Sequence, residues 1–365
     1  MKRPVAFALA FFLLAPLSGV GAEDGLSLST QVRTKASLYS TIASPSSFSI
    51  GSAAGLDFLL EGSRDRTSFR AGARLSLLQG NEAADLWLAL GMPGARDDYL
   101  LMAPVFDSAV VTPPSALLTL ALEELALRSY AGPFSFEAGL SHANWGMGRA
   151  FSPADYFTDI DYSSGQPSRR PTLLGKATWY PGPVSSLELV LTPYSKFGQA
   201  LALRGYTTIF DAVTMAVSAG LREAAGSSAG LLLGGVELSI DLSYLAPYGE
   251  AVFILDPGKS WNLQYSIMGG AETRIADLTL MGEYLFAPRK TAVHSIYAAA
   301  AWKIDEWFSL TLPLLYIPNP EHLSFGASLS ASGFGAMEYR AGLSCEKSAG
   351  GDWLLGLSLQ ASLFF

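Results

Sequence analysis

The sequence predicts an all-β chain that folds as a transmembrane, antiparallel, up-and-down β-barrel of about sixteen strands, with about fourteen to eighteen as the range. Three observations lead to this prediction. Apolar and polar residues alternate with a period of two in segment after segment. Beyond the N-terminal region no apolar run is long enough for a membrane helix, although 50% of the residues are hydrophobic. Long connections fall on alternate positions along the chain.

The N-terminus has the features of a secretory signal peptide. Lys2 and Arg3 precede an apolar run at residues 5–17, and small residues at 20–22 are suited to cleavage after Ala22. We therefore expect residues 1–22 to be removed and residues 23–365 to form a single barrel domain.

Composition and charge argue against several classes of function. A formal net charge of −8 argues against a nucleic-acid partner, because no basic face could dominate it. The single cysteine, Cys345, cannot form an internal disulfide. The sequence holds no histidine pair for zinc and no nucleophile–base pair, so we expect no metal, no cofactor and no enzymatic activity.

Sixteen segments show the strand pattern, each close to the 9–11 residues that a tilted membrane strand needs. Residues 117–128 alternate less regularly, and Glu123 with Glu124 marks either a bulge or a helical piece. The expected strands are residues 26–38, 48–61, 68–77, 117–128, 134–142, 173–181, 187–194, 213–222, 231–243, 262–272, 276–286, 294–304, 308–316, 322–331, 337–346 and 353–365.

Loop lengths provide an independent test of this pattern. If the first strand runs outward, the second, fourth and sixth connections should be short turns. Residues 62–65, 129–133 and 182–186 meet this expectation. The connections of the other parity include the long segments 79–116, 144–171, 195–212 and 245–261. A soluble β-sandwich gives no reason for lengths to segregate in this way, so the parity favours a barrel.

The last segment alternates most regularly. Residues 353, 355, 357, 359, 361, 363 and 365 are all apolar, whereas residues 356, 358, 360 and 362 are Gly, Ser or Gln. This segment, which ends in Phe365, resembles the insertion signal of bacterial outer-membrane β-barrels. The resemblance implies that the last strand closes against the first, that the barrel-assembly machinery recognises it, and that the mature chain lies in outer-membrane lipid.

Charged residues fall on the expected inward faces. The basic residues of the first and third strands would form a basic ladder, with two acids between them. Opposed charges across a pore create a transverse field that orients polar solutes. The alternative is a salt-bridge network that fills a narrow barrel, but about sixteen strands enclose a lumen too wide to fill. The candidate pore-lining residues are Arg33, Lys35, Asp57, Glu61, Arg70, Arg74, Glu188, Glu237, Asp241 and Arg340.

Residues 144–157 form the most distinctive loop. They resemble a W-G-x-G…P-x-D-[FY]-F turn of several groups of porin-like outer-membrane barrels, over about fourteen residues. The glycines permit tight turns, Pro153 fixes φ, and Asp155 can cap a turn. Such a loop can fold into the lumen and narrow it, exposing Arg149, Asp155, Asp159 and Asp161 to solute; the alternative is a plug or rim that touches none. The candidate constriction residues are Trp145, Gly146, Gly148, Arg149, Pro153, Asp155 and Tyr156.

Aromatic residues near strand ends complete the pattern. Trp145, Trp179, Trp302 and the other four tryptophans are interpreted as interfacial girdles. Together these features indicate a porin-like channel for small hydrophilic solutes in the bacterial outer membrane, and a homo-oligomer is compatible with them. The alternative is a non-conducting surface barrel that acts as an adhesin or structural protein through residues 79–116 and 144–171. A barrel for hydrophobic compounds would need an apolar inner pocket and a plugging N-terminal segment.

Overall fold

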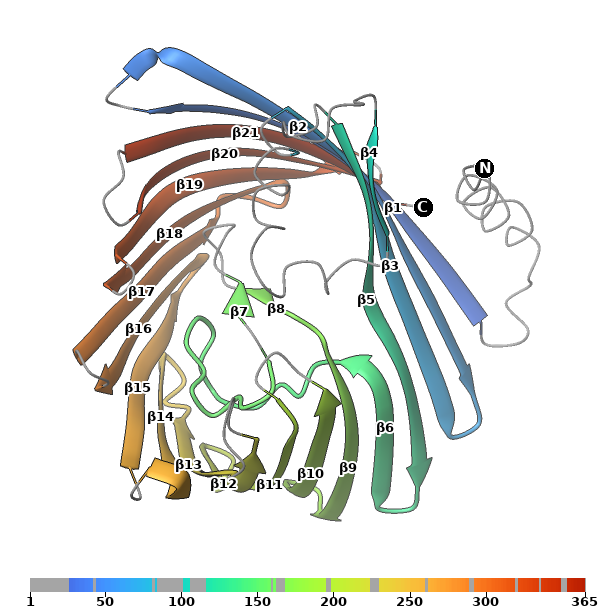
Figure 1. Ribbon diagram of the computed structural model, residues 1–365, viewed down its shortest axis with the longest axis vertical. Helices are drawn as coiled ribbons and strands as arrows, with labels where there is room; N and C mark the ends of the chain where they lie inside the picture. The colour runs from blue at the N-terminus through green and yellow to red at the C-terminus, as the bar shows by residue number, and fades with distance from the viewer. Residues whose placement is uncertain are drawn as a thin grey trace.

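The protein is a closed ring of antiparallel strands (Figure 1). The computed structural model describes residues 26–41, 44–80, 83, 101–105, 116–158, 160–161, 168–194, 198–223, 230–259, 262–288, 292–318, 321–334, 336–348 and 353–364. Within these residues eighteen strands form the ring, and the last pairs with the first. The predicted all-β barrel is confirmed, with a strand count at the upper end of the expected range. The expected signal peptide and Phe365 lie outside the described residues.

Each strand of the ring pairs with its neighbours in chain order. A short strand, β4 (Leu101–Val105), pairs with the end of β5 that β6 leaves free. Strands β7 (Ile160–Asp161) and β8 (Ser168–Arg169) form a separate ribbon inside the ring (Figure 1). The ring consists of β1 (Leu26–Thr41), β2 (Ser44–Arg64), β3 (Thr67–Gly80), β5 (Ala116–Ala131), β6 (Phe134–Ser141), β9 (Thr172–Gly182), β10 (Ser185–Tyr194), β11 (Ala200–Ile209), β12 (Val213–Arg222), β13 (Leu231–Ile240), β14 (Leu245–Asp256), β15 (Asn262–Ile275), β16 (Leu278–Pro288), β17 (Ala292–Lys303), β18 (Phe308–Pro318), β19 (Glu321–Phe334), β20 (Met337–Ser348) and β21 (Trp353–Phe364).

Helical structure is minor in the described part of the chain. A single-turn 3₁₀ helix, η3 (Pro257–Lys259), follows β14. No helix among the described residues is long and apolar enough to cross a membrane.

Two segments predicted as loops contain strands. Residues 195–212 hold β11, which pairs with β10 and β12. Residues 245–261 hold β14, which pairs with β13 and β15. The additional strand β11 reverses the expected direction of the next two strands, so β12 and β13 run opposite to the prediction. The second missed strand, β14, restores the predicted direction for every strand that follows.

The short turns lie together at one end of the ring. Neighbouring turns are joined by backbone hydrogen bonds: the Tyr130 N–H donates to Arg66 O and the Tyr180 N–H to Pro133 O, both at 2.8 Å. Asp65 and Gly132 take positive φ angles of 52° and 60° in these turns. The three connections expected to be short are therefore tight turns at the same end, as the parity predicts.

The outer surface of the ring is apolar. On β21, Leu355, Leu357 and Leu359 are 45%, 42% and 57% exposed, as expected for an outward row with a period of two. Cys345 lies directly opposite Leu355 and shares its outward face.

Exposed aromatic residues mark both ends of this outer surface. Phe134, Trp179 and Trp302 lie near the turns, and Tyr265 and Phe325 lie near the other end. Four of the seven predicted girdle tryptophans, Trp179, Trp302, Trp307 and Trp353, lie at strand ends. Trp145 does not, and Trp87 and Trp261 lie outside the described residues.

A β-bulge interrupts the pairing of β3 with β5. Gly72 lies opposite Glu124 and Ala73 lies opposite Leu122, so Glu123 is the extra residue. The bulge was one of two structures that the sequence suggested here. It brings Glu123 and Glu124 to the same side of the wall, where they bind Arg74 and Arg70.

The closing register can be tested with a disulfide. Thr34 and Ala361 lie directly opposite each other in the β1–β21 pair, at a Cβ separation of about 4.5–5.5 Å for such pairs. In a Cys345→Ser background, Thr34→Cys with Ala361→Cys should therefore cross-link under mild oxidation. The product should migrate faster than the reduced chain in a denaturing gel.

Thr34→Cys with Leu359→Cys is the matched control for this register. This pair is offset by two residues, about 7–8 Å on the diagonal, and should stay reduced. Equal cross-linking of both pairs would contradict the register.

Candidate functional site: a loop docked inside the barrel

Residues 142–158 leave β6 and turn into the ring instead of away from it (Figure 1). Four of their large side chains are almost fully buried: Trp145 is 0% exposed, Phe157 1%, and Phe151 and Tyr156 3% each. Such residues in a loop require a surface to cover them, which is the inner wall of the barrel. We call residues 142–158 the docked loop.

Two apolar clusters hold the docked loop to this wall. Trp145, Tyr156 and Phe157 pack with buried residues of β9–β14, including Val190 and Val252. The rings of Trp145 and Phe157 meet edge to face, with centroids 5.0 Å apart.

The second cluster lies farther around the ring. Ala150 and Phe151 pack with Met268 on β15, Tyr297 on β17 and Leu315 on β18. The docked loop therefore covers the inner face from β9 to β18.

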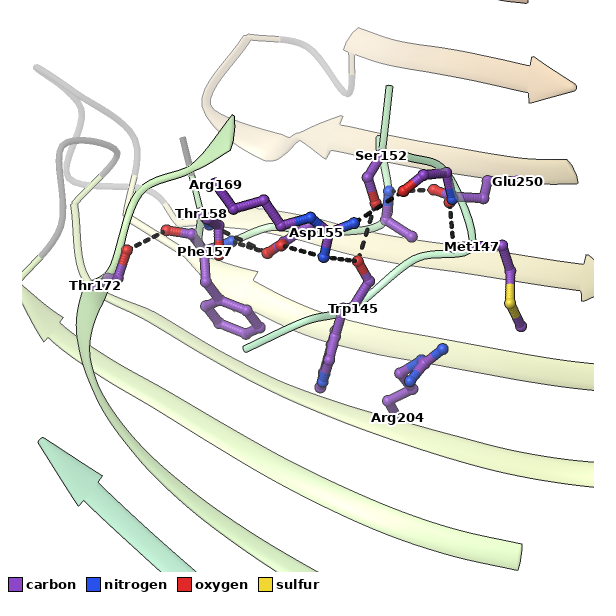
Figure 2. A network of polar contacts seen from close by, with 12 residues as sticks. Trp145, Met147, Ser152, Asp155, Phe157, Thr158, Arg169, Thr172, Arg204 and Glu250 are labelled. Carbon is purple, nitrogen blue, oxygen red and sulfur yellow. Dashed lines mark hydrogen bonds and ion pairs between the residues drawn. The ribbon is translucent and has the colours of Figure 1, made fainter. Parts of the chain in front are cut away.

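Two wall carboxylates bind the backbone of the docked loop. Glu250 on β14 accepts hydrogen bonds from the N–H groups of Met147 (2.5 Å) and Gly148 (2.7 Å) through Oε1, and of Ala154 (3.0 Å) through Oε2 (Figure 2). Glu250 is buried, and so is the second carboxylate, Glu283: each is 3% exposed.

Glu283 on β16 binds the adjacent segment of the loop. It accepts hydrogen bonds from the N–H groups of Arg149 (2.6 Å), Ala150 (2.9 Å) and Phe151 (2.8 Å), and from the Tyr248 hydroxyl (2.7 Å). Six backbone donors of the loop are thus satisfied by two side chains of the wall, as buried donors require.

Arg169, on β8, fixes the loop from the other side. Its guanidinium donates to the carbonyl oxygens of Trp145 (3.2 Å) and Gly148 (3.0 Å) and forms an ion pair with Asp155 at 3.4 Å (Figure 2). Asp155 caps the turn by accepting the N–H groups of Phe157 and Thr158, the role the sequence suggests. Burial raises the pKa of the Asp155 carboxyl, and the Arg169 guanidinium opposes this shift.

Side chains of the loop also bond directly to the strands. The indole N–H of Trp145 donates to Glu188 Oε2 at 2.8 Å, and the Tyr156 hydroxyl lies 3.0 Å from Ser218 Oγ. Arg204 lies 6.0 Å from the Trp145 ring and donates two hydrogen bonds, of 2.8 and 2.6 Å, to Glu237. Glu188 and Glu237 therefore lie beneath the docked loop.

The structure corrects three expectations about single residues. If the loop narrows the lumen, Asp155 was expected to meet solute; its side chain is instead 1% exposed, because it caps the loop. Trp145 was expected at the membrane interface, yet it lies inside the barrel. Asp241 was expected on the inner wall, yet it lies in the turn after β13, where its carboxylate accepts the Ser243 N–H.

The other residues expected to line the constriction or to meet solute lie as follows. Gly146 takes a φ of 89°, and Pro153 is half-buried. The side chain of Arg149 is 68% exposed, with Glu272 on β15 as an ion-pair partner at 3.7 Å. The side chains of Asp159 and Asp161 lie outside the described part of the chain.

The opposite wall carries the predicted basic ladder, and the arginines of this ladder are paired with acids. Asp57 on β2 bonds to both Arg33 and Arg74, and Arg74 also bonds to Glu123 at 2.7 Å. Because these side chains remain partly exposed, solvent screens the pairs, and each adds little to stability.

The same alternation of charges continues along this wall. Arg70 lies between Glu61 at 2.6 Å and Glu124 at 3.3 Å. Arg340 on β20 donates to Ser330 and Glu338, both at 3.3 Å. Lys35 lies opposite Gln360 in the β1–β21 pair, and its side chain is outside the described residues. Acids and bases therefore alternate along this wall.

Sequence reasoning missed Glu250, Arg204 and Arg169. The first two lie on the strands mistaken for loops, where a period of two was present: Leu201 and Leu203 face outward, and Ala202 and Arg204 face inward. Arg169 lies in a connection without any periodic pattern. Among the described residues no group of three His, Cys, Asp or Glu side chains could hold a metal ion.

Comparisons with known proteins agree with the fold. No protein-family model matches the sequence, and no curated protein matches it. Among solved structures, OccK9 (OpdG) and OccK5 (OpdH) of Pseudomonas aeruginosa superpose with TM-scores of 0.61 and 0.59 at 8% and 7% identity. OccAB4 of Acinetobacter baumannii gives 0.57 at 9% identity. Each alignment covers 93% of this chain and 98% of the other. At these identities the likeness establishes the fold alone.

The close approach at Gly148 provides a test of the docked loop. A Cβ added there would lie 1.7 Å from Phe151 O and 2.7 Å from Met268 Cε, so Gly148→Ala should displace the loop from the wall. We expect the backbone amides of residues 147–154 to exchange their hydrogens with solvent about tenfold faster in the folded barrel, because a displaced loop opens more often.

Gly175→Ala on β9 is the matched control, since a Cβ there meets nothing within 4 Å. It should keep the amide exchange rate of the unmodified chain. Equal protection of both variants would show that the loop is not held as closely as the structure indicates.

Proposed function

We propose that this chain is a bacterial outer-membrane channel through which small hydrophilic solutes diffuse, with the docked loop as its constriction. The observation that carries the proposal is the loop itself, bound inside a ring of eighteen described strands. Barrels of about 16–18 strands enclose more space than wall side chains can fill, which leaves an aqueous lumen. A loop fixed to one side of that lumen narrows it without needing to close it.

The outer surface supports a membrane location. Rows of leucines more than two-fifths exposed, such as Leu355, Leu357 and Leu359, would be unfavourable in water but match a lipid environment. Aromatic residues at both ends of the surface suit the two membrane interfaces. Residues 1–22 would direct export, and the C-terminal strand ending in Phe365 would engage the barrel-assembly machinery. A homo-oligomer is compatible with this arrangement.

The solved structures that share this fold support the class of function. They are outer-membrane porin channels. One of them, OpdK of Pseudomonas aeruginosa, was solved with vanillate, a small organic solute, and has a TM-score of 0.56 at 7% identity. We propose a solute of comparably small size for this chain, and no enzymatic activity.

Adhesion is the less favoured alternative. It would use residues 79–116 and 144–171 as outer binding surfaces. The described part of the second segment packs inside the barrel, where a large partner could not reach it. In a channel, a loop in that position narrows the path of the solute.

Single-channel recording in planar bilayers tests the proposal. The purified chain should give stable conductance steps that grow with salt concentration. Deleting residues 147–166 should enlarge the conductance steps, because it removes most of the docked loop that covers the inner wall. A barrel that inserts without conducting, in both forms, would refute the channel.

A pair of arginine substitutions on β21 tests the membrane location. Leu357 faces outward and Ser358 inward. In lipid vesicles, Leu357→Arg should lower the free energy of unfolding by about 2–4 kcal/mol, because it places a charge in hydrocarbon. Ser358→Arg, which adds the same side chain on the lumen side, should cost far less. Equal effects in denaturant titrations would argue against lipid around this strand.

A further inference from the structure

Glu250 and Glu283 differ from other inward carboxylates in their partners. Asp57, Glu137 and Glu237 each form ion pairs with an arginine or a lysine. In the described part of the chain, Glu250 and Glu283 have no ion-pair partner and accept bonds from the docked loop and Tyr248 instead. Their negative charge is therefore balanced by backbone dipoles of the docked loop.

Among the described residues, each cation near the two glutamates has another carboxylate as its ion-pair partner. The cations that face the two glutamates are already paired: Arg204 with Glu237, Arg149 with Glu272, and Arg169 with Asp155. Glu237 lies directly opposite Glu250 in the β13–β14 pair, which places two carboxylates side by side. Glu188 accepts the Trp145 indole N–H, and the other titratable neighbours are the hydroxyls of Tyr156, Tyr248 and Tyr297.

The hydrogen-bond pattern suits ionised carboxylates, because every partner of the two glutamates is a donor. Both oxygens of Glu250 accept N–H groups, and those of Glu283 accept three N–H groups and one hydroxyl. A protonated carboxyl would turn an O–H donor toward these donors, and its attraction for their dipoles would fall. Protonation thus removes both the charge and one acceptor position that hold the loop.

We propose that Glu250 and Glu283 form a proton-sensitive clamp that sets the width of the pore. In their ionised forms they hold residues 147–154 against the wall made by β13–β18. On protonation they release this segment, and the lumen widens. The effect on conductance rests on the proposed channel function, whereas release of the loop does not.

Thiol accessibility tests the release of the loop directly. Ser152 is 8% exposed and lies within the docked loop, where its hydroxyl donates to Trp145 O at 2.9 Å, so Ser152→Cys places a thiol of similar size at a buried position of the loop. In a Cys345→Ser background at neutral pH, the double variant Glu250→Gln and Glu283→Gln should increase labelling of this thiol by about tenfold, because the released loop opens more often.

A second pair of glutamates provides the matched control. Glu338→Gln with Glu346→Gln removes the same charge from inward positions on β20 and should leave labelling unchanged. Labelling that stays slow in the clamp variant, or rises equally in the control, overturns the clamp.

The pH profile of conductance tests the role of protonation. The unmodified channel should widen reversibly when the bathing solution is acidified, because protonation removes the charge that holds the loop. The clamp variant should conduct at the widened level throughout, and the Glu338, Glu346 control should follow the unmodified profile. A flat profile for the unmodified channel overturns the proton dependence. Faster labelling without conductance in any variant would refute the channel and still support the clamp.

Discussion

The need to pair every strand edge is the constraint on which the rest of this structure depends. A strand in an apolar surrounding cannot leave its N–H and C=O groups unbonded, so the sheet must close, here through β1 and β21. Closure with every pair antiparallel requires an even number of strands. A predicted ring that lacks one strand has an odd number and cannot close, whereas a ring that lacks two still has an even number. The prediction of sixteen strands, without β11 and β14, therefore still described a barrel that can close. The constraint explains both the success of the sequence prediction and the form of its error.

The docked loop divides the inner face of the ring into a covered wall and an open wall. From β9 to β18 the wall is covered by a loop, and apolar side chains such as Val190 and Leu315 point inward without touching water. From β1 to β5 the inner wall carries Arg33, Asp57 and Arg74 in alternation. An inward apolar residue breaks the simple rule of polar-in and apolar-out. It marks where another part of the chain docks.

The sequence predicted the class of fold, the outward face of the last strand and the turn-capping role of Asp155, because these depend on local periodicity and local geometry. It did not predict β14, where Pro247 and Gly249 favour a loop. It also placed Trp145 at a membrane interface, since an aromatic residue near a strand end fits either location. The partner of the loop backbone, Glu250, is about a hundred residues away in sequence. No local pattern could connect the two.

Because the arginines of the open wall are paired with acids, the wall carries little net charge with which to attract one kind of ion. Arg70, for example, is flanked by Glu61 and Glu124. The docked loop presents the opposite case: Arg149 is 68% exposed and has one partner, at 3.7 Å. Discrimination among solutes should therefore depend on where the loop holds this one guanidinium. The position of the loop is set by the wall carboxylates, so the groups that determine the width of the lumen also determine where the exposed guanidinium of Arg149 lies.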